Sequence, residues 1–195
     1  MIRLLVLYLL YWIQKIRYLG RVKLDGFTII LSFRNSSISI GKGSRFRSTP
    51  VYNLLGMYQR TILVARHGGT LYIGENVGMS GSTIYAMKEI WIGDNTCIGA
   101  NCKIVDNDFH SFDPGLNFTT DPLHLKMKPV LIGENCFIGM NSIVLKGTTI
   151  GNISDMDGRA IIENVPANAI LVVSYIGYVT QEVTLKSNQT NIKIT

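Results

Sequence analysis

The stretch EIWIGDNTCIGANCKIV, residues 89–105, decides the fold, because an aliphatic residue recurs in it at every sixth position. Ile92, Ile98 and Ile104 carry this period. The same spacing resumes further along the chain, at Ile132, Ile138, Val144 and Ile150. A looser copy comes earlier, with its aliphatic or aromatic positions at Ile73, Met79 and Tyr85. We predict that the residues at this step form the core.

A period of six excludes an α-helix, whose apolar face recurs every three or four residues, and it excludes an ordinary alternating strand. Each hexamer is therefore predicted to form one flat side of a triangular coil, with the aliphatic residues stacked inward. The glycine, Asn or Asp residues beside them would accommodate the tight corners. The predicted fold is an all-β solenoid.

Two stretches, Ile92 to His110 and Lys128 to Gly147, resemble the polysaccharide O-acetyltransferases and serine acetyltransferases of the hexapeptide-repeat family. The resemblance covers about residues 30–150 and implies a left-handed parallel β-helix, with a domain over 26–150. It also implies a cytoplasmic homotrimer that moves an acetyl group from acetyl-CoA to a saccharide hydroxyl, without a metal. Some proteins with this repeat are only scaffolds, because a fold alone does not establish chemistry.

The repeat is interrupted by a loop, expected over residues 105–129, that opens with Val105-Asp106-Asn107-Asp108-Phe109-His110. Loops that interrupt a rigid scaffold often carry active sites. A sugar hydroxyl needs a base that takes its proton as it attacks a thioester, and histidine can do this. We therefore expect His110 to be the general base, with Asp106 or Asp108 orienting the imidazole or positioning the acceptor. The alternative is a loop histidine that is satisfied by neighbouring carboxylates.

The resemblance also places acetyl-CoA, which in the family lies in a groove between subunits beside the catalytic loop. The residues expected to border this groove are Phe137, Gly139, Met140 and Ser142. A side chain at Gly139 would block the thioester arm, whereas Phe137 could equally be a core aromatic. His67 and His124 match no motif of the family and are interpreted as surface or packing residues.

The net charge of +6 is concentrated at the N-terminus, because the first acidic residue is Asp25. The rest of the chain has no basic stripe with interleaved aromatic residues, so nucleic-acid binding is not expected. The apolar run from Leu4 to Gln14 is too short to cross a bilayer. We expect an amphipathic helix over 1–25 that either contacts a membrane surface, such as the inner membrane, or packs on the protein. The odd count of three cysteines, without a Cys-x-x-Cys pair, favours reduced thiols.

The period changes to two after Gly151, where short β-rich runs alternate with turns. Asp155-Met156-Asp157-Gly158 and Leu171-Val172-Val173-Ser174-Tyr175-Ile176-Gly177-Tyr178 resemble the carboxypeptidase-regulatory-like β-sandwich of SusC-like TonB-dependent receptors. This resemblance runs from about Val144 to Thr195, and 151–195 is predicted to be a β-sandwich-like fragment. A chimera joined through 144–151 is one interpretation, and degenerate β-helix coils are the other.

These observations favour an acetyl-CoA-dependent O-acetyltransferase, with activity in doubt because the C-terminal coils of the family are missing. The alternative is a non-enzymatic binding module, or an inactive chimera.

Overall fold

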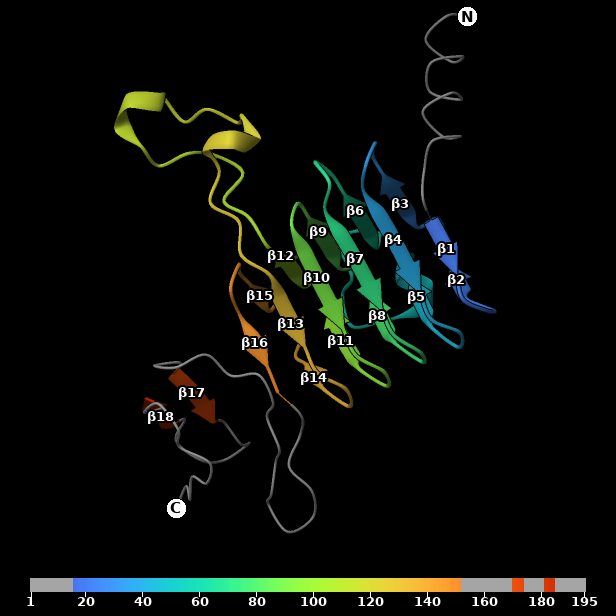
Figure 1. Cartoon of the computed structure of the whole chain (residues 1–195). Coiled ribbons are helices and arrows are strands. Elements are labelled where there is room, and N and C mark those ends of the chain that lie inside the picture. Colours follow the sequence, from blue (N-terminus) through green and yellow to red (C-terminus); the bar gives the residue numbers. More distant parts are fainter. Residues whose placement is uncertain (1–15, 152–169, 174–180, 185–195) are drawn as a thin grey trace, which may run out of the picture. The chain divides into compact units, whose positions relative to one another are not determined.

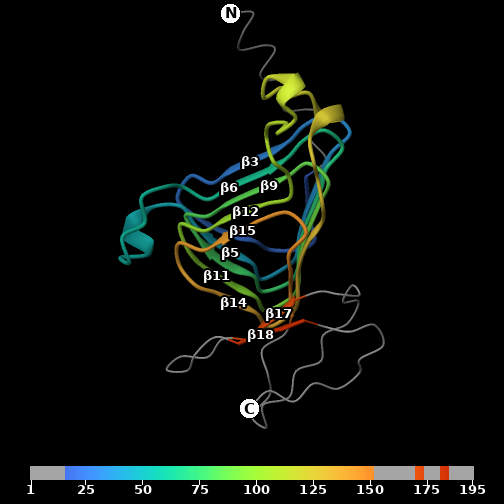
Figure 2. The same cartoon turned by 90° about the vertical axis from the view of Figure 1, so that its left-hand side faces the viewer.

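The computed structural model describes residues 16–151, 170–173 and 181–184. Three parallel sheets share residues 16–151, and consecutive strands pass from one sheet to the next (Figures 1 and 2). The first sheet contains β1 (Ile16–Tyr18), β4 (Ser37–Ile40), β7 (Thr70–Ile73), β10 (Glu89–Ile92), β13 (Val130–Ile132) and β16 (Thr149–Ile150). The second contains β2 (Lys23–Asp25), β5 (Arg45–Arg47), β8 (Gly78–Ser80), β11 (Cys97–Ala100) and β14 (Phe137–Ile138). The third contains β3 (Ile29–Ser32), β6 (Ile62–Ala65), β9 (Thr83–Ala86), β12 (Lys103–Val105) and β15 (Ile143–Val144).

This arrangement confirms the predicted left-handed parallel β-helix, in which each coil contributes one strand to every sheet. The first coil begins at Ile16, so residues 16–25 form strands and turns and not the end of a helix. The rest of the expected N-terminal helix, residues 1–15, lies outside the described residues. Among the residues that the structure describes, no helix has the length and apolar character needed to cross a membrane.

The six-residue period forms the core as predicted, because equivalent residues of successive coils lie in register. Ile92 pairs with Ile73 and Ile132 in the first sheet, and all three side chains are fully buried. Ile98 pairs with Met79 and Ile138 in the second sheet, and these side chains are buried as well.

The expectation that Tyr85 lies in this core is wrong. Ile84 is the buried residue that pairs with Ile104, and Tyr85 points outward opposite Val105. The register shifts between Ile98 and Ala100, where β11 has a bulge that accommodates one more residue than β8 does. The step from the core residue of β8 to that of β9 is therefore five residues.

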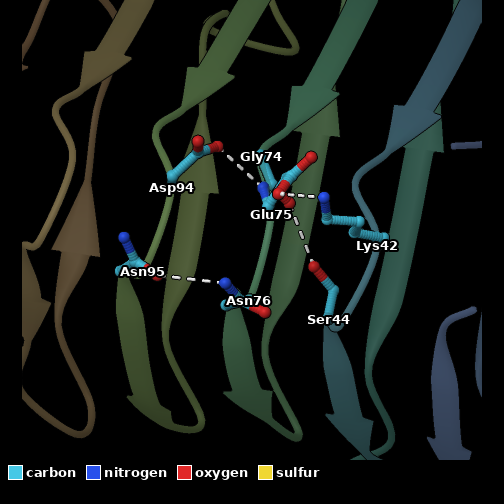
Figure 3. Close-up of polar contacts among 7 residues, drawn as sticks. All are labelled: Lys42, Ser44, Gly74, Glu75, Asn76, Asp94 and Asn95. Atoms are coloured by element: carbon cyan, nitrogen blue, oxygen red, sulfur yellow. Dashed lines mark hydrogen bonds and ion pairs between the residues drawn. The ribbon is translucent and has the colours of Figure 1, made fainter. Parts of the chain in front are cut away.

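The corners between the first and second sheets are closed by a polar ladder (Figure 3). The Glu75 backbone N–H donates to Asp94 Oδ1 at 2.7 Å, and Asn76 Nδ2 donates to Asn95 Oδ1 at 3.2 Å. Asn76 and Asn95 have left-handed backbones, with φ of 54° and 56°. The glycine that precedes each corner is required by close stacking, since a Cβ on Gly93 would lie 2.6 Å from the nitrogen of the next coil's corner. Each coil is thereby fixed against the next.

Two insertions leave the coils. Residues 48–61 contain the short 3-10 helix η1 (Pro50–Tyr52), and residues 106–129 contain η2 (Pro114–Leu116) and η3 (Pro122–His124). Figure 2 shows them leaving from different corners of the coil, the first in teal and the second in yellow. The second insertion follows β12 and agrees with the loop that the broken repeat predicts.

The chain divides into two compact units, residues 1–160 and 161–195. The described part of the second unit is an antiparallel pair of strands, β17 (Ile170–Val173) and β18 (Gln181–Thr184). Both strands fall within predicted β-rich runs. The remaining predicted runs, 160–162 and 191–194, lie outside the described residues.

Candidate active site

His110 lies on the exposed surface of the 106–129 loop, and its ring is held by a backbone carbonyl. His110 Nδ1 is 3.1 Å from the carbonyl oxygen of Phe118. A carbonyl oxygen can only accept, so in the neutral ring Nδ1 carries the hydrogen and Nε2 keeps a free lone pair. The sequence analysis expected Asp106 or Asp108 to orient the imidazole. In the structure the Phe118 carbonyl, in the same loop, does so.

Asp106 fastens the loop to the β-helix and does not contact the His110 ring. Its side chain is fully buried. The carboxylate accepts hydrogen bonds from the backbone N–H groups of Met87, Lys88 and Glu89 at 2.7 to 2.8 Å. Met87 and Lys88 form the corner between β9 and β10, and Glu89 begins β10, so Asp106 holds this turn.

The Asp108 carboxylate also has a partner other than His110. Its carboxylate forms an ion pair with Lys146, which follows β15 in the fifth coil, the coil made of β13, β14 and β15. Both side chains are largely shielded from solvent. The Asp108 carbonyl accepts the His110 backbone N–H at 2.6 Å. The sequence analysis did not identify Lys146. Its ion pair with Asp108 links the loop beside His110 to the end of the β-helix.

His110 borders two clefts. The larger has a volume of about 610 Å³ and is lined by Arg66, His67, Tyr85, Met87, Phe109, His110, Thr119, Thr120, Asp121, Pro122 and Leu125. The smaller has a volume of about 320 Å³ and includes Asp108, His124 and Lys126 in its lining. His110 therefore borders a space large enough for a sugar. In its lining, the rings of Tyr85 and Phe109 are in edge-to-face contact, with their centroids 4.9 Å apart.

His67 lies in the larger cleft although the sequence analysis assigned it no role. It belongs to the turn between β6 and β7. Partial desolvation, and then the positive charge of Arg66, lower the pKa of His67, while Asp121 opposes this effect. The sequence alone offers no sign of this role, because His67 lies far from the 106–129 loop along the chain. The two segments line one cleft only in the folded structure.

The four residues expected to bind acetyl-CoA all lie on the fifth coil. Phe137, Gly139 and Met140 are exposed, and Ser142 is half-buried with its hydroxyl donating to the Gly139 carbonyl at 2.7 Å. Phe137 is 66% exposed, which is inconsistent with the core role considered for it. Two further apolar side chains on this coil, Ile143 and Leu145, are exposed as well. The outer face of the coil thus offers apolar surface that suits a pantetheine arm.

Two of the three cysteines, Cys102 and Cys136, lie at corners of the β-helix, whereas Cys97 begins β11 and is exposed. Cys102 Sγ donates to the Gly139 carbonyl at 3.0 Å, and Cys136 Sγ donates to the Gly151 carbonyl at 2.6 Å. Burial raises the pKa of both thiols. None of the three cysteines forms a disulfide in the described part of the chain.

The β-helix is similar to known acetyltransferases. A family model described as the hexapeptide repeat of succinyl-transferase matches residues 89–104. "Putative lipopolysaccharide biosynthesis O-acetyl transferase WbbJ" of Escherichia coli is 28% identical over 110 residues, covering 53% of this chain and 56% of that protein. "Probable acetyltransferase Rv3034c" of Mycobacterium tuberculosis is 28% identical over 145 residues, covering 69% of this chain and 47% of that protein. The chain thus spans about half the length of each of these two relatives.

The C-terminal part is similar to a different kind of protein. The CarboxypepD_reg-like domain model matches residues 134–195 and so begins before the expected Val144. "TonB-dependent receptor P39" of Formosa agariphila is 49% identical over 51 residues, which cover 26% of this chain and 5% of the receptor. No solved structure gives a significant match. The chain therefore combines a hexapeptide-repeat β-helix, which is similar to acetyltransferases, with a CarboxypepD_reg-like segment. The CarboxypepD_reg-like match begins at residue 134, within the part of the chain that forms the last coils of the β-helix.

Proposed function

We propose that this chain is an acetyltransferase that moves the acetyl group of acetyl-CoA to a saccharide hydroxyl, with His110 as general base. The observation that carries the proposal is the His110 ring, whose Nδ1 is held by the Phe118 carbonyl at 3.1 Å beside a cleft of about 610 Å³. A base needs a fixed tautomer and a free lone pair within reach of the substrate proton. Nε2 meets the first two requirements.

The proposed step conserves the proton. The acceptor hydroxyl oxygen bonds the carbonyl carbon of the thioester while its proton moves to Nε2 of His110. The carbon–sulfur bond then breaks, and the departing thiolate takes the proton from the imidazolium. The enzyme returns to its starting state without a covalent intermediate.

For the donor, we assign Phe137, Gly139, Met140 and Ser142, in a groove completed by a neighbouring subunit of a homotrimer. Support comes from the exposure of Phe137 and Met140 on the outer face of the fifth coil. Gly139 is also open on that face, since a Cβ there would meet only the Ser142 hydroxyl, at 3.8 Å. A cytoplasmic location goes with this proposal because the donor is a cytoplasmic metabolite.

In this proposal Asp106 and Asp108 position the loop and do not contact the imidazole or the acceptor. Asp106 would act by holding the 87–89 turn and the start of the loop, and Asp108 would act by docking the loop on Lys146. Both are positioning residues in this proposal.

One experiment tests the proposal as a whole. The full chain is incubated with acetyl-CoA and a panel of methyl glycosides, and acetylated sugar is measured by mass spectrometry beside a calorimetric titration with acetyl-CoA. Saturable donor binding together with an acetylated product is expected. A well-folded chain that binds no acetyl-CoA would contradict the donor assignment.

The second candidate is a non-enzymatic β-helix module. It is favoured by one observation, the CarboxypepD_reg-like match that begins at residue 134, inside the coil assigned to the donor. The same titration separates the two functions, because a binding module has no reason to bind acetyl-CoA.

A further inference from the structure

His67 stands out among the corners of the β-helix. The other non-glycine corner residues with left-handed backbones in the described coils are all asparagines: Asn35, Asn76, Asn95, Asn101, Asn135 and Asn141. His67 has φ of 55° in the same kind of position. Asparagine enters this region more readily than other residues with a side chain. Histidine also enters this region, so His67 fits the turn but differs from the asparagine found at the other corners.

The turn that carries His67 is firmly held. The Gly69 N–H donates to the Arg66 carbonyl at 3.0 Å, and the Gly68 N–H donates to Ser36 Oγ at 3.1 Å. Gly69 also packs on the next coil, where a Cβ would lie 2.5 Å from the Ala86 carbonyl oxygen. The backbone therefore fixes the position of the His67 Cα and the direction in which its side chain leaves the turn. A binding residue needs such a rigid attachment.

The cleft brings this corner together with the catalytic loop. His67 comes from the turn between β6 and β7, whereas His110 comes from the insertion after β12, and both line the same cleft. The lining also includes Tyr85 and Phe109, whose ring centroids are 4.9 Å apart. Thr119 and Thr120 add hydroxyl groups. Apolar rings with a few convergent hydrogen-bonding groups are what a saccharide ring needs, because it has both C–H faces and hydroxyl edges.

The state of His67 suits hydrogen bonding to a neutral ligand. Its pKa is lowered by partial desolvation and by Arg66, an effect that Asp121 opposes. The neutral imidazole has one donor and one acceptor nitrogen, so it can bind a hydroxyl in either direction.

We propose that His67 is a second acceptor-binding residue, which hydrogen-bonds a hydroxyl of the saccharide other than the one that faces His110. This inference rests on the proposed function and assigns the acceptor to the cleft between the β6–β7 turn and the 106–129 loop. His67 selects and orients the sugar, and His110 removes the proton.

The test compares His67→Asn with Asn95→His in acetyl transfer to the best methyl glycoside. Asn95 has nearly the same φ, 56°, at an exposed corner outside the cleft. His67→Asn is expected to raise the acceptor KM about three- to tenfold, the effect of one lost hydrogen bond, with the KM for acetyl-CoA unchanged. Asn95→His is expected to leave both KM values unchanged. An unchanged acceptor KM in His67→Asn would overturn the inference while leaving the proposed function intact.

A binding measurement decides the matter if no transfer is observed. The imidazole proton resonances of His67 and His110 are followed by NMR as methyl glycosides of glucose, galactose and N-acetylglucosamine are added. Both resonances are expected to shift with the same sugar and the same concentration dependence. Such shifts without transfer would support the site and contradict the proposed function. If no sugar moves the His67 resonance, the inference is wrong.

Discussion

Replacing Asp106 by alanine should destabilise the β-helix more than its position in a loop suggests. The carboxylate is fully buried and accepts three backbone N–H groups at 2.7 to 2.8 Å, with Asn107 Nδ2 as a fourth donor at 3.1 Å. Hydrogen bonds to a charged group contribute about 1.5–3 kcal/mol each, and an unsatisfied buried donor costs about 1–3 kcal/mol. The Lys88 and Glu89 donors are only partly buried, so water can reach them. We expect a loss of about 3–5 kcal/mol.

Urea unfolding, followed by the fluorescence of Trp12 and Trp91, measures this loss. Asp94→Ala is the matched control, because Asp94 accepts a single corner N–H, that of Glu75, and is half-buried. It should cost about 1 kcal/mol. If Asp106→Ala unfolds within about 1 kcal/mol of the parent chain, Asp106 does not hold the loop, and a direct role beside His110 becomes the better explanation.

Three further perturbations test other parts of the structure. Ile92→Ala removes a fully buried ladder residue and should lower the free energy of unfolding by about 3–4 kcal/mol in a urea titration; a loss under about 1 kcal/mol would mean that the ladder is loosely packed. Lys146→Ala frees Asp108 from its ion pair. It should lower kcat several-fold and cost about 1–3 kcal/mol of stability, because the largely shielded Asp108 carboxylate loses its partner, and an unaltered kcat would remove Lys146 from the site. Iodoacetamide at pH 8 should modify exposed Cys97 first, because burial raises the thiol pKa of Cys102 and Cys136 and leaves less thiolate at that pH. Equal rates for all three cysteines in mass spectra of the native chain would contradict the buried corners.

The fold could be predicted because, in a β-helix, the side chains that stack in the core recur at every sixth residue along the chain. Ile92, Ile98 and Ile104 give the side of each sheet that faces inward, and the structure places them there. Tyr85 shows the limit of this reasoning, since the segment from β8 to β9 is one residue shorter than the paired segment from β11 to β12, and the core position in β9 is therefore Ile84. A bulge changes the count along the chain without changing the composition.

The site could be predicted only in part, because its residues meet through tertiary structure. The sequence predicted the loop, which the structure shows after β12, and it suggested His110 as the base with Asp106 and Asp108 beside the imidazole. Their carboxylates are occupied by backbone N–H groups and by Lys146. The group that holds the ring is the Phe118 carbonyl, which no side-chain pattern can reveal. His67 became visible only when the β6–β7 turn and the loop were found to line one cleft.

The C-terminal part raises a question about the fifth coil. Residues 134–151 match the CarboxypepD_reg-like domain, yet they form β14, β15 and β16 of the β-helix. The hydrophobic positions Ile138 and Val144 satisfy the β-helix ladder because they pair with Ile98 and Ile104. Lys146, in the same tract, supplies the ion pair to Asp108 of the 106–129 loop. In this chain, residues 134–151 therefore form part of the β-helix, although they also match the CarboxypepD_reg-like domain.

The most direct measurement is the acetyl transfer rate of the full chain beside His110→Ala, at saturating acetyl-CoA and with the sugar that reacts best. Removal of a general base typically costs about 10²–10⁴-fold. We predict a fall of at least about a hundredfold in kcat/KM for the acceptor, with the calorimetric affinity for acetyl-CoA unchanged. Equal rates for the two chains would contradict the assignment of His110 as the base.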